Sequence, residues 1–168
     1  MAAPIHVTHL VYHFAAGGLE NVITQLINGL PADRFRHSVI AVTSVDPVYR
    51  QRVTRADVTW HSLDKGPGQP FRLYPKMLGL LKSLQPDVLH SCNLAALDFV
   101  PVAAMAGVRR RIHAEHGWSV EDPGGKSRKN QWIRRFYRPW ISEYAAREGA
   151  ADLRRSVFLL DEGGATTL

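Results

Sequence analysis

The stretch "IHVTHLVYHFAAGGLENVITQLINGL", residues 5–30, decides the fold of this chain. Its first ten residues are rich in β-branched and aromatic side chains, which is typical of a strand. The later part repeats apolar residues at the spacing of one helix face, namely Val22, Ile23, Leu26, Ile27 and Leu30. Gly17 and Gly18 separate the two parts. The stretch therefore predicts a strand, a glycine turn and an amphipathic helix.

The same alternation continues outward from this stretch. Further strands are predicted at residues 37–44, 57–63, 86–90 and 109–115, and further helices at 74–84 and 94–107. We expect Pro101 to bend the last of these helices and Gly107 to end it. Strands that alternate with helices through short connections favour a parallel sheet covered on both faces. The predicted fold class is α/β, a Rossmann-like doubly wound parallel sheet in a single domain.

Composition limits the classes of protein to which the chain can belong. Its 168 residues suffice for one domain with a hydrophobic core, and 45% hydrophobic and 21% charged residues are ordinary for a soluble protein. No apolar run approaches the roughly 18–20 residues that cross a bilayer. The N-terminus lacks the basic and apolar regions of a signal peptide. A single cysteine, Cys92, excludes an internal disulfide and favours a reducing cytoplasm.

The chain is strongly basic. Its formal net charge is +6 and its sequence pI is about 9.8. This charge predicts attraction to an anionic partner, which leaves nucleic acid, a membrane surface and a phosphorylated ligand open.

Polar side chains gather where the predicted strands end. In doubly wound sheets, ligands bind outside the carboxyl ends of the strands. Strand one runs through His13 into Gly17 and Gly18, strand four ends at His90 and runs into Asn93, and strand five leads into "IHAEHGW", residues 112–118. We therefore expect a functional site at this edge of the sheet.

The glycine pair suits an anion at the start of a helix, because glycines let backbone N–H groups approach it. The stretch is not G-x-G-x-x-G, and no acidic residue closes the second strand, which ends at Thr43 and Ser44. A dinucleotide site is therefore disfavoured. Taken by itself, the pair is better explained as a tight turn.

Three segments together are more specific: "HLVYHFAAGGLENVITQLINGL", "PDVLHSCN" and "AAMAGVRRRIHAEHGW", in this order. They resemble the N-terminal domain of GT-B glycosyltransferases of the family-4 type, and more narrowly the sugar transferases of exopolysaccharide gene clusters. The resemblance covers residues 5–144. It implies transfer of a sugar from a nucleotide-sugar donor to a lipid-linked or other glycan acceptor, with retained anomeric configuration. It also implies that no cofactor and no metal are needed.

The resemblance assigns roles to particular residues. Gly17 and Gly18 match the turn that lies against the donor diphosphate, and His116 matches the histidine that faces the donor sugar, which makes His116 the predicted catalytic residue. Glu115 lies beside it on the donor side. The residues predicted to line the acceptor side are His90, Asn93 and Trp118. Trp118 suits stacking on a sugar ring or simple packing, and the sequence leaves both open.

A zinc site is the competing chemistry for these histidines. His113 and His116 are three residues apart, and residues three apart in a strand point to opposite faces. The chain also has no H-E-x-x-H pattern. We therefore predict no metal site, and we expect His113 and Cys92 to be buried structural residues.

Residues 125–140, "GKSRKNQWIRRFYRPW", combine cations with aromatic side chains. The basic residues are Lys126, Arg128, Lys129, Arg134, Arg135 and Arg138. An apolar stripe of Trp132, Ile133, Phe136, Tyr137 and Trp140 is predicted on one helix face. We expect the stripe to pack on the core and the cations to attach the protein to an anionic membrane, on the inner face of the cytoplasmic membrane. Nucleic acid is the less favoured partner.

The chain departs from the family pattern after residue 144. A GT-B enzyme has a second, nucleotide-binding domain with two glutamates eight positions apart, and no such pair occurs here. We predict an acceptor-side domain at residues 1–144 and a divergent or truncated tail at 145–168. The chain by itself is then expected to be inactive, and its uncovered surface to bind a separate C-terminal domain or a second copy. A non-catalytic acceptor- or membrane-binding module, or a basic nucleic-acid-binding domain, are the alternatives.

Overall fold

A computed structural model describes residues 3–68, 70–115 and 126–145. The strands are β1 (Ile5–Val11), β2 (Phe35–Ala41), β3 (Thr59–Ser62), β4 (Val88–Cys92), β5 (Arg110–Ala114) and β6 (Glu143–Ala145). The α-helices are α1 (Gly18–Gly29), α2 (Tyr74–Leu84), α3 (Leu94–Leu97), α4 (Val100–Met105) and α5 (Arg128–Tyr137). Short 3-10 turns occupy Tyr49–Arg52, Pro70–Leu73 and Arg138–Trp140.

The strands form one six-stranded sheet in the order β3-β2-β1-β4-β5-β6, and every pairing in it is parallel. Strand order reverses beside β1, because β2 lies on one side of it and β4 on the other. This is the doubly wound, Rossmann-like order. The predicted fold class is confirmed.

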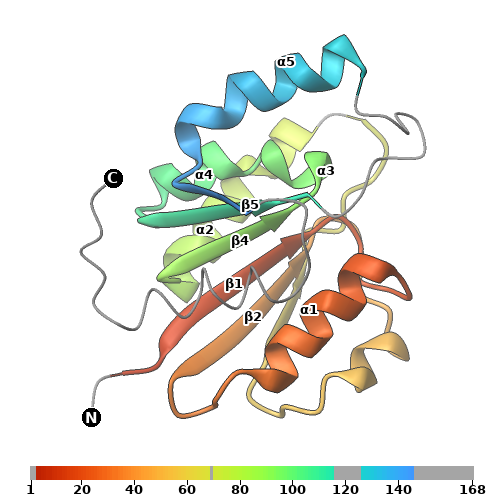
Figure 1. The fold of residues 1–168 in the computed structure, drawn as a ribbon, viewed down its shortest axis with the longest axis vertical. Helices are drawn as coiled ribbons and strands as arrows, with labels where there is room; N and C mark the ends of the chain where they lie inside the picture. The colour runs from red at the N-terminus through yellow and green to blue at the C-terminus, as the bar shows by residue number, and fades with distance from the viewer. Residues whose placement is uncertain (1–2, 69, 116–125, 146–168) are drawn as a thin grey trace.

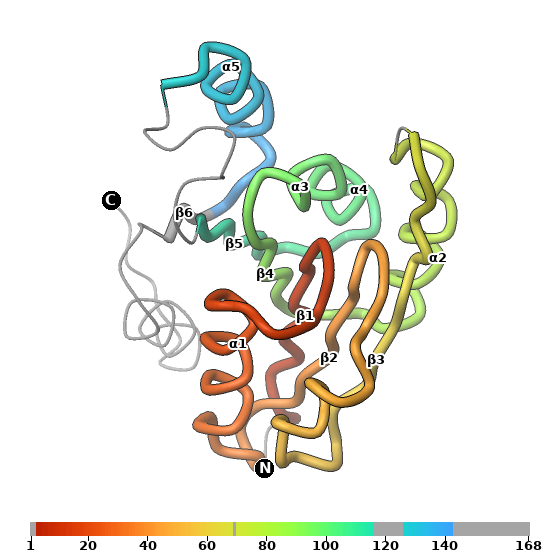
Figure 2. Tube along the Cα trace, turned by 90° about the vertical axis from the view of Figure 1, so that its right-hand side faces the viewer, coloured from red at the N-terminus to blue at the C-terminus, as the bar shows by residue number. Residues whose placement is uncertain are grey.

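Helices cover both faces of the sheet (Figure 1). The tube view in Figure 2 shows α1 on one side of the strands and α2 on the other. On the α1 face, Leu26 packs with Val7. On the opposite face, Met77 of α2 and Ala103 of α4 pack with Leu10.

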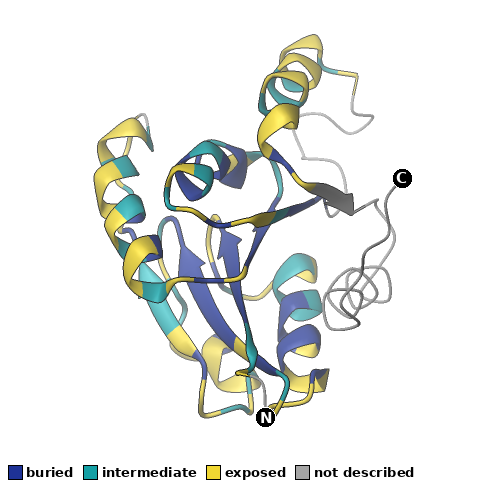
Figure 3. Cartoon of the chain, turned by 90° about the vertical axis from the view of Figure 1, so that its left-hand side faces the viewer, coloured by how far each residue is buried: buried dark blue, intermediate teal, exposed yellow. Residues whose placement is uncertain are grey.

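The central strands are buried over their length, as the dark ribbon of Figure 3 shows. The helices present mixed faces, and α5 has no buried residue. Tertiary burial therefore supports the central strands from both sides, whereas α5 lies against the domain through only part of its surface.

The predicted helix at 94–107 is two helices in the structure. The break falls at Asp98 and Phe99, ahead of Pro101, which lies in the first turn of α4. Proline has no N–H to donate, and its ring collides with the carbonyl four residues earlier, so the helix is interrupted before it rather than bent at it. The predicted end at Gly107 has the positive φ of 89° that glycine favours.

The last strand was not among the predicted elements. β6 pairs with β5 through Ile112↔Glu143, His113↔Tyr144 and Ala114↔Ala145. The boundary predicted at residue 144 therefore falls within a strand of the sheet. The predicted tail at 145–168 lies, beyond Ala145, outside the described residues.

Candidate functional site

The carboxyl ends of the strands place several predicted residues on one edge of the sheet. β1 leads to Gly17 and Gly18, and its neighbour β4 leads to Asn93. β1 and β4 are paired in register at His9↔His90, so their exits are adjacent. Beyond β4, β5 leads to Glu115.

Gly17 and Gly18 form the start of α1. Gly17 is the N-cap, and as a glycine it contributes no side-chain cap of its own. A methyl group on Gly17 would overlap the Glu20 carboxylate, whereas one on Gly18 would meet nothing within 4 Å. The turn thus presents the positive end of α1 with a glycine at the N-cap, which is an arrangement that suits an anion, although the Glu20 carboxylate already lies against it.

Glu20 is the acidic group nearest to this turn. Burial raises the pKa of its carboxyl, an effect opposed by a backbone hydrogen bond and by the nearby His13. Its negative charge stabilises the start of α1 in the absence of a bound anion. An incoming phosphate has to displace this carboxylate or bind beside it.

His13 is an exposed group at this edge to which the sequence analysis assigned no role. Its Nδ1 lies 3.0 Å from the Ser44 hydroxyl and 3.4 Å from the Thr43 hydroxyl, which connects the exits of β1 and β2. Two features of the sequence could have indicated a role for His13. It lies at the end of the first predicted strand, and two hydroxyl residues, Thr43 and Ser44, end the second. His13 can donate to or accept from a polar ligand at the glycine turn.

A cavity of about 280 Å³ lies beside this group, at the carboxyl ends of β2 and β3. Its lining residues are Ser44, Val45, Arg50, Trp60, His61, Ser62 and Asp64. A larger cavity of about 530 Å³ lies near the amino ends of β4 and β5, between Lys82 and Arg109. We place the candidate site at the edge of the sheet that carries the smaller cavity. Ligands of doubly wound sheets bind at this edge, where the strands have their carboxyl ends.

His90 does not line an open site, contrary to its predicted acceptor-facing place. It is 0% exposed in the middle of β4, with its Nδ1 3.0 Å from Nδ1 of His9. Cys92 is equally buried, and burial holds the pKa of its thiol well above the ordinary value. The expectation that Cys92 and His113 are buried residues is confirmed, since both are 0% exposed.

Asn93 occupies the bend between β4 and α3. Its φ of 59° is positive and its ψ of 167° lies outside the left-handed helical region, so the backbone has a conformation that residues with a side chain rarely adopt. Its backbone N–H donates to the Ala114 carbonyl at 2.9 Å, which ties the exit of β4 to the end of β5. The side chain is half-buried at the edge where the acceptor was predicted.

Glu115 is held by α5. Its two carboxylate oxygens accept from Nε and Nη2 of Arg134 at 2.6 and 2.7 Å, and the residue is only 7% exposed. Arg134 was predicted to bind membrane anions, but the structure places its guanidinium in this bidentate pair. The pair fixes the exit of β5 against α5.

The aromatic residues of α5 divide between two faces instead of forming one core-facing stripe. Ile133 and Tyr137 pack against Leu97 and Val100, and Tyr137 donates to Asp98 at 2.7 Å. Trp132 and Phe136 stack on each other at 5.5 Å while remaining 67% and 55% exposed. The exposed basic residues of this segment are Lys126, Arg128, Lys129, Arg135 and Arg138.

Two predicted residues, His116 and Trp118, lie outside the described residues. Within the described ranges, no group of three or more histidine, cysteine, aspartate or glutamate side chains is arranged to hold a metal ion. In the same part of the chain, no helix has the length and apolar character needed to span a membrane.

The sheet order and the glycine turn at a strand exit define a Rossmann-like domain of the kind that makes up one half of GT-B enzymes. The sequence matches Glycosyltransferase Family 4 over residues 16–151. The chain therefore belongs to this family. A search of curated proteins found no significant match.

Solved structures agree on the fold. A putative UDP-N-acetylglucosamine 2-epimerase from Listeria monocytogenes is 17% identical, with a TM-score of 0.56 over 96% of this chain and 42% of that one. The lipopolysaccharide outer core galactosyltransferase WaaB in its apo form is 12% identical, with a TM-score of 0.56 over 88% and 44%. A further UDP-N-acetylglucosamine 2-epimerase is 14% identical, with a TM-score of 0.57 over 97% of this chain and 46% of that one.

The chain spans less than half the length of each of these three structures. At such identities the likeness establishes the shared fold and not a shared substrate.

Proposed function

We propose that this chain forms the acceptor-side half of a glycosyltransferase that takes a sugar from a nucleotide-sugar donor. The observation that carries the proposal is the turn at Gly17 and Gly18, which begins α1 at the carboxyl edge of the sheet with a glycine as the N-cap. Family membership supplies the reaction class, sugar transfer. The basic charge of +6 favours a phosphorylated donor.

In this proposal the donor diphosphate accepts hydrogen bonds from the first N–H groups of α1. The helix dipole adds a favourable interaction with the negative charge. His116 faces the donor sugar and orients its anomeric carbon. Glu115, which Arg134 holds through two hydrogen bonds, fixes the position of the chain directly before His116. The reaction is proposed to retain the anomeric configuration, with no metal ion in the transfer step.

The acceptor in this proposal is a glycan carried on a lipid, of the kind used in exopolysaccharide synthesis. Asn93 and Trp118 lie on the acceptor side, and His13 joins them as a polar group beside the turn. His90 is not retained in this set, since its ring is enclosed in the sheet.

Binding of nucleotide sugars tests the donor assignment directly. We expect saturation-transfer NMR to detect one class of nucleoside-diphosphate sugar from a panel that varies the base and the sugar, with weak affinity because the chain spans less than half of its structural relatives. His116→Ala should weaken the signal from the sugar protons more than that from the base. If no nucleotide sugar gives a signal while glycolipids do, the chain is an acceptor-binding module instead.

A second proposal concerns attachment to membranes, which the exposed face of α5 favours. The stack of Trp132 and Phe136 offers an interfacial aromatic surface, and the neighbouring cations, including Arg128 and Arg135, suit anionic headgroups. We expect the protein to float with vesicles that contain phosphatidylglycerol, and salt to weaken this binding.

The variant Trp132→Ser/Phe136→Ser should lower vesicle binding several-fold. The matched control is Val48→Ser, because Val48 is also largely exposed, at 74%, but lies in another part of the chain. Binding to neutral and anionic vesicles alike, or binding that both variants reduce equally, would contradict this assignment.

A further inference from the structure

The sheet contains a row of buried histidines that the proposed function does not use. His37 of β2, His9 of β1 and His90 of β4 lie on the face that α1 covers, and each is at most 1% exposed. Nδ1 of His37 lies 3.1 Å from Nε2 of His9, and Nδ1 of His9 lies 3.0 Å from Nδ1 of His90. The row ends at Cys92, whose Sγ lies 3.4 Å from Nε2 of His90.

Register explains why the three rings meet. His9 is directly opposite His90, and His37 is opposite Val7, one same-face position before His9. The rings of His9 and His37 are stacked at 5.3 Å, and those of His9 and His90 meet edge to face at 5.2 Å. Three neighbouring strands thus share one hydrogen-bonded chain of imidazoles through the middle of the sheet.

The number of protons that this chain can hold is fixed by its geometry. Each link joins two ring nitrogens, or a ring nitrogen and the thiol, so it needs one donor and one acceptor. Three neutral rings, each with one N–H, and one thiol satisfy all three links when every ring donates toward Cys92. In the opposite direction, the single N–H of His37 lies on its buried Nε2, which has no hydrogen-bond partner. An additional proton on His9 makes two N–H groups face each other across one link.

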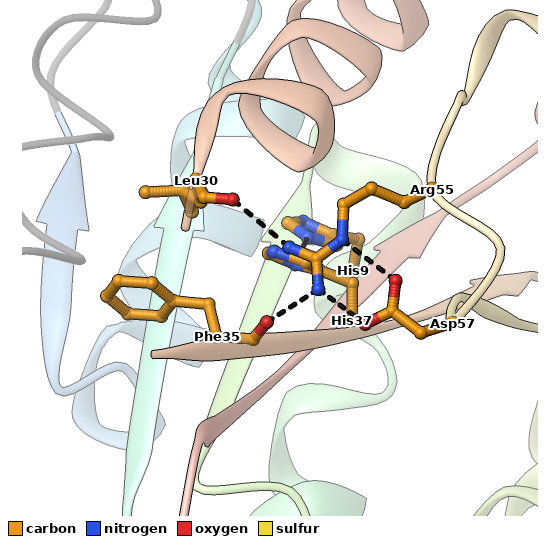
Figure 4. A network of polar contacts seen from close by, with 6 residues as sticks. All are labelled: His9, Leu30, Phe35, His37, Arg55 and Asp57. Atoms are coloured by element: carbon orange, nitrogen blue, oxygen red, sulfur yellow. Dashed lines mark hydrogen bonds and ion pairs between the residues drawn. The ribbon is translucent and has the colours of Figure 1, made fainter. Parts of the chain in front are cut away.

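His37 cannot take the additional proton either. Its Nε2 is buried and has no hydrogen-bond partner, so a proton there would be an unpaired donor in the interior. The same proton would place a charge beside the Arg55 guanidinium (Figure 4), whose side chain is 10% exposed and pairs with Asp57. The Arg55 guanidinium donates hydrogen bonds to the carbonyls of Leu30 and Phe35. Moving it away from His37 would break these hydrogen bonds.

Among the described residues, the other groups that face the row do not remove this penalty. His6 approaches from the opposite face of the sheet, and Glu20 of α1 acts on Cys92 at the far end. The remaining α1 side chains over the row are uncharged: Ile23, Thr24, Leu26 and Ile27. The phenol of Tyr49 belongs to the same cluster as Cys92. On β5, the same face is formed by Ile112 and Ala114.

We propose that this row of neutral imidazoles is an acid-sensitive switch that holds β2, β1 and β4 together at neutral pH and releases them on mild acidification. The strands that it joins are those that lead to the glycine turn and to Asn93. Mild acid should therefore disrupt the carboxyl-edge site together with the sheet.

The direction of the pH effect follows from the titration of the rings. Burial, and the neighbouring His90 and His37, hold the pKa of His9 well below its ordinary value, while burial and Arg55 lower the pKa of His37 to about 3. The unfolded chain then binds more protons than the folded one below a pH of about 6.5. Stability is complete above that pH and declines as the pH falls toward the folded-state pKa values.

Glu20, whose pKa is raised, gains stability as the pH falls, which is opposite in sign to the histidines, whereas Asp57 and Asp64 act in a lower window. Hydrogen bonding lowers the pKa values of Asp57 and Asp64, so their contribution is present above a pH of about 4 and is lost below it. Between about pH 6 and pH 4.5 the loss of stability therefore reports on histidines.

Urea unfolding of the whole chain at a series of pH values tests the proposal. Each histidine that takes up a proton on unfolding multiplies the unfolding constant by up to about ten for every pH unit, so His9 and His37 together contribute up to about a hundredfold per unit. His37→Gln should reduce the slope by about one proton.

NMR titration of the imidazole Cε1–H signals keeps the test decisive if a row variant fails to fold. In the folded wild-type chain the signals of His9 and His37 should titrate well below the ordinary pH range of histidine. Rings of the row that titrate near pH 6.5 in the folded protein, or unfolding by urea that does not change between pH 7.5 and pH 5, would overturn the proposal.

Discussion

The Glu115 carboxylate shows how one residue connects the sheet to a peripheral helix. Among residues 3–68, 70–115 and 126–142, whose burial the structure describes, it is the only buried carboxylate. Arg134 gives it two short hydrogen bonds, which compensate for the loss of water. The geometry therefore gives α5 a fixed position at the edge of the site.

Breaking this pair should be costly because the carboxylate remains buried. We expect Arg134→Met to lower the free energy of unfolding by about 2–3 kcal/mol. Arg135→Met, at the exposed neighbouring position, should change it by less than about 0.5 kcal/mol. Urea denaturation followed by circular dichroism measures both values.

A double-mutant cycle with Glu115→Gln identifies the contact responsible. If the pair acts as described, the two substitutions together cost clearly less than their sum. Additive effects would show that Arg134 stabilises the domain through something other than Glu115.

Gly18 allows stability and ligand binding to be separated. A methyl group there meets nothing within 4 Å, and alanine favours a helix over glycine by up to about 1 kcal/mol. Gly18→Ala should therefore keep or raise stability while weakening the binding of a nucleotide sugar, because the methyl group stands where the diphosphate approaches.

Gly79→Ala is the matched control for Gly18→Ala. Gly79 lies within α2, and a methyl group there also meets nothing within 4 Å. It should give a similar gain in thermal stability with no effect on ligand binding. Equal nucleotide-sugar affinity in the two variants would remove the glycine turn from the site.

At the scale of elements, α5 is amphipathic in an unusual way. The face toward the domain contacts it through Ile133 and Tyr137, which pack on Leu97 and Val100. The opposite face carries the stacked rings of Trp132 and Phe136. Periodicity in the sequence groups these residues into one stripe. Only the packing partners show which of them the domain uses.

The two faces should respond differently to truncation. Ile133→Ala is expected to cost about 1–2 kcal/mol of unfolding free energy, because it removes methyl groups that pack on α3. Trp132→Ala should cost less than about 0.5 kcal/mol, because its ring is 67% exposed. Thermal unfolding of both variants measures the difference, and a larger loss for Trp132→Ala would reverse the assignment of faces.

Elements with long apolar periodicity could be predicted from the sequence, and those decided by tertiary contacts could not. The helix at Tyr74–Leu84 has the predicted bounds, because it carries a sustained helical pattern and tolerates Pro75 in its first turn. The short strand Glu143–Ala145 has no such pattern and exists through its pairing with β5. The break ahead of Pro101 depends on where the proline ring meets the preceding turn.

The site could be predicted in its location but only partly in its residues. Strand exits are set by the alternation of elements, so the place of Gly17 and Asn93 follows from the sequence. His90 was misplaced because a histidine near a strand end suits either a polar site or a buried hydrogen bond, and register decides between them. His13 was noticed at a strand exit but given no role, because its partners Thr43 and Ser44 come from another strand.

At the scale of the whole molecule, one parallel sheet serves two purposes. Its carboxyl edge carries the proposed donor turn, and its interior contains polar imidazoles where most Rossmann-like sheets have aliphatic residues. Five of the eight histidines are buried among the described residues: His6, His9, His37, His90 and His113. The stability of the domain and the geometry of its site are therefore coupled through the same strands.

The central claim is that the carboxyl edge of this sheet, at the start of α1, receives the diphosphate of a nucleotide sugar. Mapping amide chemical shifts of the ¹⁵N-labelled chain during a titration with nucleotide sugars tests it most directly. We predict saturable shifts at Gly17, Gly18 and Leu19 that Gly18→Ala abolishes and Gly79→Ala preserves. Shifts confined to the cavity between Lys82 and Arg109, or no shifts with any nucleotide sugar, would contradict the claim.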